Sequence, residues 1–421
     1  MIRRRHVIYV CGYDPQGAEG YYRIFQSSWR RVLKLWNLQG TLGDLHIDSE
    51  DFGHWDIEAS GPNWQVSTRY DFLRQEQMIR ANMSESMWRQ APRSILWTLK
   101  AHITGSHLRV MRGAWKYGLS LFHFQMMMVY WVLIAAVGGA LAVWALNLFV
   151  SAHVLVDVAI GAVAAIAVFM LLRPLADYLF VVQINSHWPY LVEYARGEPS
   201  CWDQAIEAGG QRVVEVARAN AVDEVIVIGH SGGGITAPAV MARALELDPD
   251  VGRHGPKVVL LTIGSIMPAI GLYRAAVKVR AVIERIAVEP SVRWIDAQAR
   301  KDIMNFWEFD PVAGIGIEVG ERRCNPLIWP LRFADMLTPE LYKRLNWNFF
   351  RLHYQFLMAN ELRAPYDFFM VVAGPVPVED WARRGRGVLA AFAEDATYIE
   401  PRMGWQTADA PAATPIAHKT G

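Results

Sequence analysis

The sequence has few charged residues, few cysteines and almost no excess of either charge sign. Charged residues make up 20% of the 421 residues, below the usual share of about 25%. The formal net charge of +1 creates no global field for a polyanion, so we expect no nucleic-acid partner. Cys11, Cys201 and Cys324 are widely spaced and form no CxxC motif. This spacing excludes a disulfide framework and a cysteine-based zinc site, and we expect no metal and no cofactor.

The missing charges are concentrated in one region. From Tyr117 to Val156 the chain contains no Asp, Glu, Lys or Arg. Within this region, residues 129–150 would form a helix of about 33 Å, enough to cross a hydrocarbon core of roughly 30 Å. A second apolar run, residues 154–172, has one charge, Asp157, near its start. The sequence therefore predicts a helical hairpin of two transmembrane spans; a buried core hairpin and a re-entrant insertion are the alternatives.

The residues that flank the hairpin predict its orientation. Basic residues lie before the first span and after the second, and the connecting turn has none: Lys100, Arg109, Arg112, Lys116 and Arg173. By the positive-inside rule both flanks are cytoplasmic. The basic N-terminus is followed by only a short apolar run and is not a signal peptide. We expect an integral membrane protein with a cytoplasmic catalytic domain, whose two helices approach closely at small residues, namely Gly138, Gly139 and Gly161.

Outside the hairpin, strand patterns alternate with helix patterns. We expect strands at 6–10, 223–228, 257–263 and 292–295, and helices at 21–38, 204–218 and 235–247. Such alternation is typical of a parallel sheet that is covered on both faces. The predicted fold is α/β, with a doubly wound, mostly parallel sheet formed by residues 1–116 and 185–403. The membrane hairpin is expected at 117–184, and a disordered tail at 404–421.

A nucleophile motif lies between a predicted strand and a predicted helix. The segment Gly229-His230-Ser231-Gly232-Gly233 matches G-x-S-x-G. A serine on such a sharp turn projects its hydroxyl above the sheet edge, and the glycines are needed because side chains would collide with the neighbouring strand and helix. The following helix points its positive dipole end at a developing oxyanion. Ser231 is thus the candidate nucleophile, and an ordinary tight turn is the alternative.

Together with VCGYDP after the first strand and the later segments DPV and HYQ, this motif resembles the α/β-hydrolase superfamily, especially its lipase-like and esterase-like members. The resemblance implies a chain order of nucleophile, acid and histidine. Beyond Ser231 the sequence has His254, His353 and His418. His254 precedes every plausible acid, and His418 lies in the expected tail. The resemblance therefore implies His353 as general base, the alternative being a surface histidine on an amphipathic helix.

Three aspartates are candidates for the acid. Asp296, Asp302 and Asp310 all follow a late strand, where an acid could orient the imidazole. The Asp310-Pro311-Val312 segment resembles the acid-bearing turn of several lipase-like hydrolases. We therefore favour Asp310, with Asp302 as the alternative acid; a plain turn at Asp310 is also open.

The resemblance also implies an oxyanion hole made of backbone amides. One donor is expected at Gly232, and the other in the loop Gly12-Tyr13. A packing role is the alternative for Tyr13. Cys11 is discounted as a nucleophile because a cysteine at a strand end is more often buried and inert.

The long insertion between the oxyanion loop and the motif bears on the substrate. It holds the hairpin and a tryptophan-rich approach with Trp97 and Trp115 among basic residues, which is typical of a bilayer interface but also of amphipathic core helices. We expect a membrane-anchored serine hydrolase that cleaves a lipid or other lipophilic ester through an acyl-enzyme on Ser231. An acyltransferase or thioesterase with the same residues, and a non-catalytic membrane scaffold, are the alternatives.

Overall fold

The computed structural model describes residues 1–151, 153–178 and 181–399. It divides into two compact units. The sheet unit comprises Met1–Glu76, Trp202–Met267 and the chain from Arg280 onward, and the hairpin unit comprises Gln77–Cys201 and Pro268–Val279. The expected boundaries at 116 and 185 thus lie inside the hairpin unit, and the expected tail at 404–421 lies outside the described residues.

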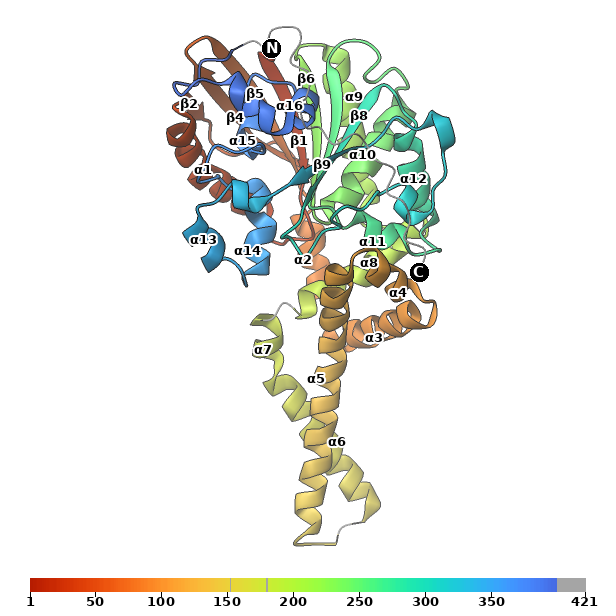
Figure 1. Cartoon of the computed structure of the whole chain (residues 1–421). Coiled ribbons are helices and arrows are strands. Elements are labelled where there is room, and N and C mark those ends of the chain that lie inside the picture. The colour runs from red at the N-terminus through yellow and green to blue at the C-terminus, as the bar shows by residue number, and fades with distance from the viewer. Residues whose placement is uncertain (152, 179–180, 400–421) are drawn as a thin grey trace. The chain divides into compact units, whose positions relative to one another are not determined.

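The sheet unit is a mixed α/β fold around a nine-stranded, mostly parallel sheet (Figure 1). Its parallel strands are β1 (Arg4–Val10), β5 (Trp64–Leu73), β6 (Glu224–His230), β7 (Lys257–Ile263), β8 (Val292–Ala299) and β9 (Leu327–Leu331). Three antiparallel strands, β2 (Gln39–Leu42), β3 (His46–Ile47) and β4 (Phe52–Gly61), extend one side. The order is β2-β4-β5-β1-β6-β7-β8-β9, with β3 paired to β4.

The two parts of the chain that flank the hairpin share this one sheet. Strand β1 pairs in parallel with β6, so that Ile8 lies beside Val227. Both residues are fully buried, as the unbroken apolar character of these strands predicts for a sheet with two covered faces. The four expected strands are confirmed, 257–263 with its expected bounds and the other three with shifted ends, whereas β2 to β5 and β9 were not expected.

Helices cover both faces of the sheet (Figure 1). On one face, α1 (Gly17–Trp36), α15 (Phe368–Ala373) and α16 (Val378–Arg384) contribute to a continuous apolar core. On the other, α9 (Asp203–Ala219) and α10 (Gly233–Leu247) pack on β1 and β6. The unit also contains α13 (Pro339–Arg344) and α14 (Phe349–His353), while α11 (Met267–Gly271) and α12 (Val277–Ala287) connect β7 to β8.

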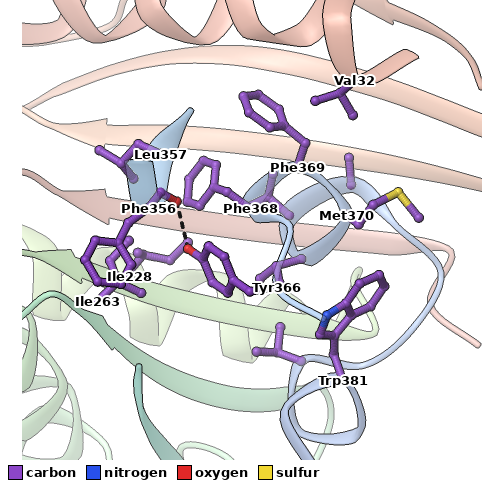
Figure 2. Close-up of a cluster of buried hydrophobic side chains, with 14 of the residues drawn as sticks. Val32, Ile228, Ile263, Phe356, Leu357, Tyr366, Phe368, Phe369, Met370 and Trp381 are labelled. Carbon is purple, nitrogen blue, oxygen red and sulfur yellow. Dashed lines mark hydrogen bonds between the residues drawn. The ribbon is translucent and has the colours of Figure 1, made fainter. Parts of the chain in front are cut away.

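The core on the α1 face holds the segment that follows α14 in place. Figure 2 shows Phe356 and Tyr366 against Ile228 of β6 and Ile263 of β7, with the Tyr366 hydroxyl donating to the Phe356 carbonyl at 2.8 Å. All four side chains are almost completely buried. Because burying an aromatic ring removes about 150–250 Å² from water, this packing fixes the backbone that begins immediately after α14.

The hairpin unit contains two helices that are long and apolar enough to cross a membrane, α5 (Trp115–Asn147) and α6 (Val154–Leu171). At 1.5 Å per residue, α5 is about 50 Å long and exceeds the predicted span at its N-terminal end. Much of the apolar surface of both helices is exposed, including Trp144, Leu155, Val163 and Leu171. Shorter helices complete the unit: α2 (Glu76–Ser84), α3 (Met87–Ile103), α4 (Ser106–Gly113), α7 (Arg173–Tyr178) and α8 (Val181–Ala195).

Small residues bring α5 and α6 together, as the sequence predicts. A Cβ atom at Gly139 would lie 2.4 Å from the Gly161 carbonyl oxygen, so a larger residue has no room there. Nearby, the Trp131 indole donates to the Phe169 carbonyl at 2.9 Å and stacks on the Phe169 ring at 4.3 Å between centroids. These contacts hold the two helices as one hairpin.

Candidate active site

The candidate residues come from the carboxyl ends of parallel strands. Gly12 follows β1, Ser231 follows β6 and Asp302 follows β8. Because these strands run in the same direction, their carboxyl ends meet at one edge of the sheet, which is where open α/β sheets bind their ligands. The topology therefore brings together residues that are far apart in the sequence.

Ser231 occupies a strained turn between β6 and α10. Its φ of 57° lies in the left-handed region, which a residue with a Cβ atom rarely adopts. A Cβ at Gly229 would lie 2.4 Å from the Gly233 carbonyl oxygen, and one at Gly233 would lie 2.2 Å from the carbonyl oxygen of Val10. This confirms the expectation that both glycines are required by the close approach of a helix and a neighbouring strand.

The backbone of Ser231 is held by the end of β7. Its amide donates to the Ile263 carbonyl at 3.1 Å, and its own carbonyl accepts from the Ile266 amide at 3.3 Å. The residue is only half-buried. The turn thus fixes the serine backbone and leaves its side chain at the surface of the sheet edge.

The loop after β1 lies against this turn. A Cβ at Gly12 would lie 3.1 Å from Ser231 Cβ and 3.5 Å from the Gly232 amide nitrogen, so the two predicted oxyanion segments are neighbours. Gly232 precedes the first residue of α10, where amides have no partner within the helix. Tyr13 is half-buried at a bend of the loop.

His353 pairs with Asp302. His353 Nδ1 lies 2.7 Å from Asp302 Oδ2, and the two side chains are 6% and 0% exposed. The other carboxylate oxygen accepts from the Met304 amide at 2.8 Å. Since a carboxylate accepts the hydrogen bond, the neutral ring carries its proton on Nδ1 and leaves Nε2 as a proton acceptor. Among the described residues, Nε2 has no hydrogen-bond partner.

Asp310, the acid favoured from the sequence, does not contact His353. Its carboxylate forms a bidentate pair with Arg323 at 2.7 and 2.8 Å and accepts from the Val312 amide at 2.9 Å. Burial acts to raise the pKa of Asp310, but the Arg323 guanidinium and the amide outweigh burial, and the pKa lies below its usual value. The Asp-Pro-Val segment is therefore a turn held by an ion pair, and the alternative acid, Asp302, is the one beside the histidine.

Asp296, the third aspartate, is also directed elsewhere. It is buried and accepts hydrogen bonds from the Thr262 hydroxyl at 2.5 Å and the Gln298 amide at 2.8 Å. Burial raises its pKa to about 6, which its hydrogen bonds only partly offset. Near neutral pH the Asp296 carboxylate is therefore a buried negative charge. Its hydrogen-bond donors, Thr262 and Gln298, are both uncharged.

His353 lies beside the residues that adjoin Ser231. The ring of His230 lies 4.7 Å from that of His353, between centroids, and His230 Nε2 lies 3.3 Å from the His353 carbonyl oxygen. A Cβ at Gly264, next to the Ser231 amide acceptor Ile263, would lie 3.2 Å from His353 Cε1. Among the described residues, no hydrogen bond joins Ser231 to His353.

No protein-family model, curated protein or solved structure matches the chain.

A further contact, not predicted from the sequence, joins the Gly12-Tyr13 loop to the segment that carries His353. Asp14 is buried and accepts hydrogen bonds from the hydroxyls of Tyr354 and, at 3.3 Å, Tyr21. Tyr354 directly follows His353, and Asp14 follows Gly12 by two residues. The sequence offered one signal for this link, the unexplained aspartate of the VCGYDP segment.

Cys11 also lies at this edge but is not exposed to solvent. Its thiol is buried, and burial, followed by the nearby Asp14 carboxylate, raises its pKa well above the usual value. A thiol with a raised pKa forms little of the nucleophilic thiolate. Within the described residues, no three His, Cys, Asp or Glu side chains converge on a common point as a metal site requires.

Proposed function

We propose that this protein is a serine hydrolase of the α/β-hydrolase type that cleaves carboxylic esters through an acyl-enzyme on Ser231. The observation that carries the proposal is the buried Asp302–His353 hydrogen bond of 2.7 Å beside a serine with positive φ. Backbone strain of this kind is costly and persists where the surroundings impose it, often at functional sites. A buried aspartate that orients a histidine is the arrangement that activates a serine.

The proposed reaction uses each group in turn. Ser231 Oγ attacks the ester carbonyl carbon while His353 Nε2 takes the hydroxyl proton, and Asp302 stabilises the resulting imidazolium. The Gly232 amide and an amide of the Gly12-Tyr13 loop stabilise the oxyanion. Collapse breaks the bond to the leaving alcohol, which receives the proton from His353. Water then attacks the acyl-enzyme by the same route, and the carboxylic acid leaves.

The order of the residues along the chain also supports this assignment. Ser231, Asp302 and His353 follow one another as nucleophile, acid and histidine, which is the order found in α/β-hydrolases. The first follows β6, the second follows β8, and the third comes after β9. The serine lies on a strand-turn-helix, the context that this fold requires for its nucleophile.

We further propose that the hairpin anchors the enzyme in a bilayer, with the sheet unit on the cytoplasmic side, and that the substrate is a lipid or another lipophilic ester. Support comes from the exposed apolar surfaces of α5 and α6. At the base of the hairpin, Lys100 Nζ lies 4.7 Å from the Trp97 ring and Lys116 Nζ lies 5.8 Å from the Trp115 ring. Indoles beside ammonium groups are favoured at the headgroup level.

Labelling with a fluorophosphonate probe tests the chemistry. The detergent-solubilised full chain should be labelled, and Ser231→Ala should abolish labelling. Ser265→Ala is the matched control, because Ser265 is a second serine that follows a parallel strand of the same sheet, β7, and it lies against Gly234 of α10. Absent labelling of the wild type, or equal labelling of Ser231→Ala, would refute an acyl-enzyme on Ser231.

Carbonate extraction of membranes tests the anchor. A protein held by two spans stays in the membrane pellet at alkaline pH, whereas a peripherally bound protein is released. Release of the full chain would contradict the spanning hairpin without affecting the proposed chemistry.

A further inference from the structure

The segment Lys343–Phe350, here called the aromatic loop, comprises the end of α13, the connection and the start of α14. It presents two aromatic side chains to solvent. Trp347 is 82% exposed and Phe350 is 39% exposed. In the described part of the sheet unit, no other Phe, Tyr or Trp side chain is as exposed as these two. The other described rings of the unit are buried or half-buried, so this pair is an exception that its own core does not explain.

The loop is ordered by its own contacts. Leu345 and Leu352, on either side of the aromatic pair, are buried. The Asn348 amide donates to the Leu345 carbonyl at 2.9 Å, and the Asn348 side chain accepts from the Arg351 amide at 3.0 Å. These contacts fix the backbone on both sides of Trp347.

The same loop touches the candidate active site. The Lys301 ammonium, one residue before Asp302, donates to the Asn346 side chain. At its other end the loop runs into α14, whose last residue is His353 (Figure 1). Anything that binds the exposed rings thus binds beside the segments that carry the acid and the histidine.

The stretch of chain that carries the rings has a net positive charge. Between residues 340 and 351 the chain has Lys343, Arg344 and Arg351 against one acidic residue, Glu340, which gives 3 − 1 = +2. Lys343 and Arg344 are exposed in the last turn of α13. Exposed indole and phenyl rings beside lysine and arginine are the combination that inserts into the headgroup region of an anionic bilayer.

We propose that the loop from Lys343 to Phe350 is a second membrane contact, carried by the sheet unit itself and directed at an anionic lipid surface. Two rings cover far less than the roughly 800 Å² per partner of a stable protein interface, but a partly inserted Trp and Phe suffice for interfacial binding. The contact rests on the proposed anchor, because two helices of membrane length held in a bilayer would keep its surface at high effective concentration. The contact does not depend on the proposed hydrolase activity.

The test measures how deeply the aromatic loop of the full chain inserts into a bilayer. Cys201 and Cys324 are exposed and are replaced by serine, while Cys11 is buried. An environment-sensitive fluorophore is attached at Phe350→Cys, with Trp347 retained, and the protein is placed in nanodiscs that hold one copy each. The matched control carries the fluorophore at Pro62→Cys, an exposed position in the turn between β4 and β5.

In discs with phosphatidylglycerol, the label at 350 should emit at shorter wavelength and be quenched by brominated lipids, whereas the label at 62 should behave as in water. Trp347→Gln should reduce this quenching. Replacing Lys343 and Arg344 with glutamine should lower the ratio of membrane-inserted to water-exposed loop by about fivefold for each charge removed.

Equal, water-like emission at both positions would overturn the proposal, and so would quenching that appears only in discs with two copies, since that outcome means pairing between chains. Neither result depends on catalysis. Failure of the membrane contact and failure of the proposed hydrolase reaction are therefore distinguishable.

Discussion

Replacing Asp302 with asparagine is expected to lower kcat toward a soluble ester by about 10³- to 10⁴-fold while the protein stays folded. In the structure, Asp302 Oδ2 accepts from His353 Nδ1 at 2.7 Å, and Oδ1 accepts from the Met304 amide at 2.8 Å. An asparagine keeps its carbonyl on the Met304 amide, so its NH₂ faces the ring. His353 Nδ1 must then accept, its proton moves to Nε2, and the ring no longer takes a proton from Ser231.

The expected magnitude follows from two losses. The wrong tautomer removes the general base, and the imidazolium loses a fully buried counter-charge. Since each tenfold change in rate corresponds to about 1.4 kcal/mol, the predicted loss is about 4–5.5 kcal/mol of transition-state stabilisation. A surface ion pair, by comparison, is worth only about 0–1 kcal/mol.

The control is Asp310→Asn, which removes the acid that the sequence favoured. It breaks the bidentate pair with Arg323 and is expected to lower the melting temperature while kcat stays within about threefold of wild type, because Asp310 is outside the histidine's reach. Both variants are assayed by p-nitrophenyl ester turnover and by the rate of fluorophosphonate labelling. The reasoning is refuted if Asp302→Asn keeps more than a tenth of wild-type kcat, or if Asp310→Asn loses as much.

Three further predictions concern packing, pH and loop positioning. Gly233→Ala places a Cβ 2.2 Å from a backbone oxygen, whereas the Cβ of Gly387→Ala meets nothing within 4 Å. The first substitution should lower the free energy of unfolding by about 1–3 kcal/mol or more, and the second should change it very little. Equal melting temperatures of the two variants would contradict the close approach at Gly233. The folded-state pKa of Asp296 is raised from 3.8 to about 6, so the folded chain binds this proton more tightly and stability falls as pH rises from about 4 to 6. Asp296→Asn should therefore stabilise the protein by up to about 3 kcal/mol at pH 8 and very little at pH 4, and a gain independent of pH would argue against a buried charge. Asp14→Asn weakens the hydrogen bond from Tyr354 and should lower kcat by roughly tenfold to a hundredfold with little change in KM or melting temperature; an unchanged kcat would mean that this contact does not position the histidine segment.

Much of the sheet was predictable because its central strands are local apolar runs. Residues 257–263 were expected as a strand and form β7, and the G-x-S-x-G segment lies on the expected strand-to-helix turn. Strands β4 and β5, which pair antiparallel with each other, were missed because they mix polar with apolar residues and carry a weaker local signal than the unbroken apolar strands. The two apolar helices of the hairpin were evident from composition alone, although α5 begins well before its apolar part.

The choice of acid could not be made from the sequence. Asp296, Asp302 and Asp310 lie within fifteen positions of one another, each on or after the same strand, and a local pattern does not reveal which carboxylate faces a ring about fifty residues later. The familiar look of the Asp-Pro-Val turn pointed to Asp310, whose carboxylate is paired with Arg323 in the structure. Similarly, the Asp14–Tyr354 contact joins residues 340 positions apart, and no local pattern predicts such a pairing.

The sequence by itself determined the alternation of strands and helices, the apolar hairpin, and the turn that places Ser231 between a strand and a helix. These features depend on periodicity, hydrophobicity and glycine at fixed spacing, all of which act over a few residues. Only the tertiary structure decided that Asp302 holds His353, that Asp310 is held by Arg323, and that Trp347 stays in solvent. Such contacts depend on which strands are neighbours in the sheet. That order, and not distance along the chain, sets which loops meet at the edge of the sheet.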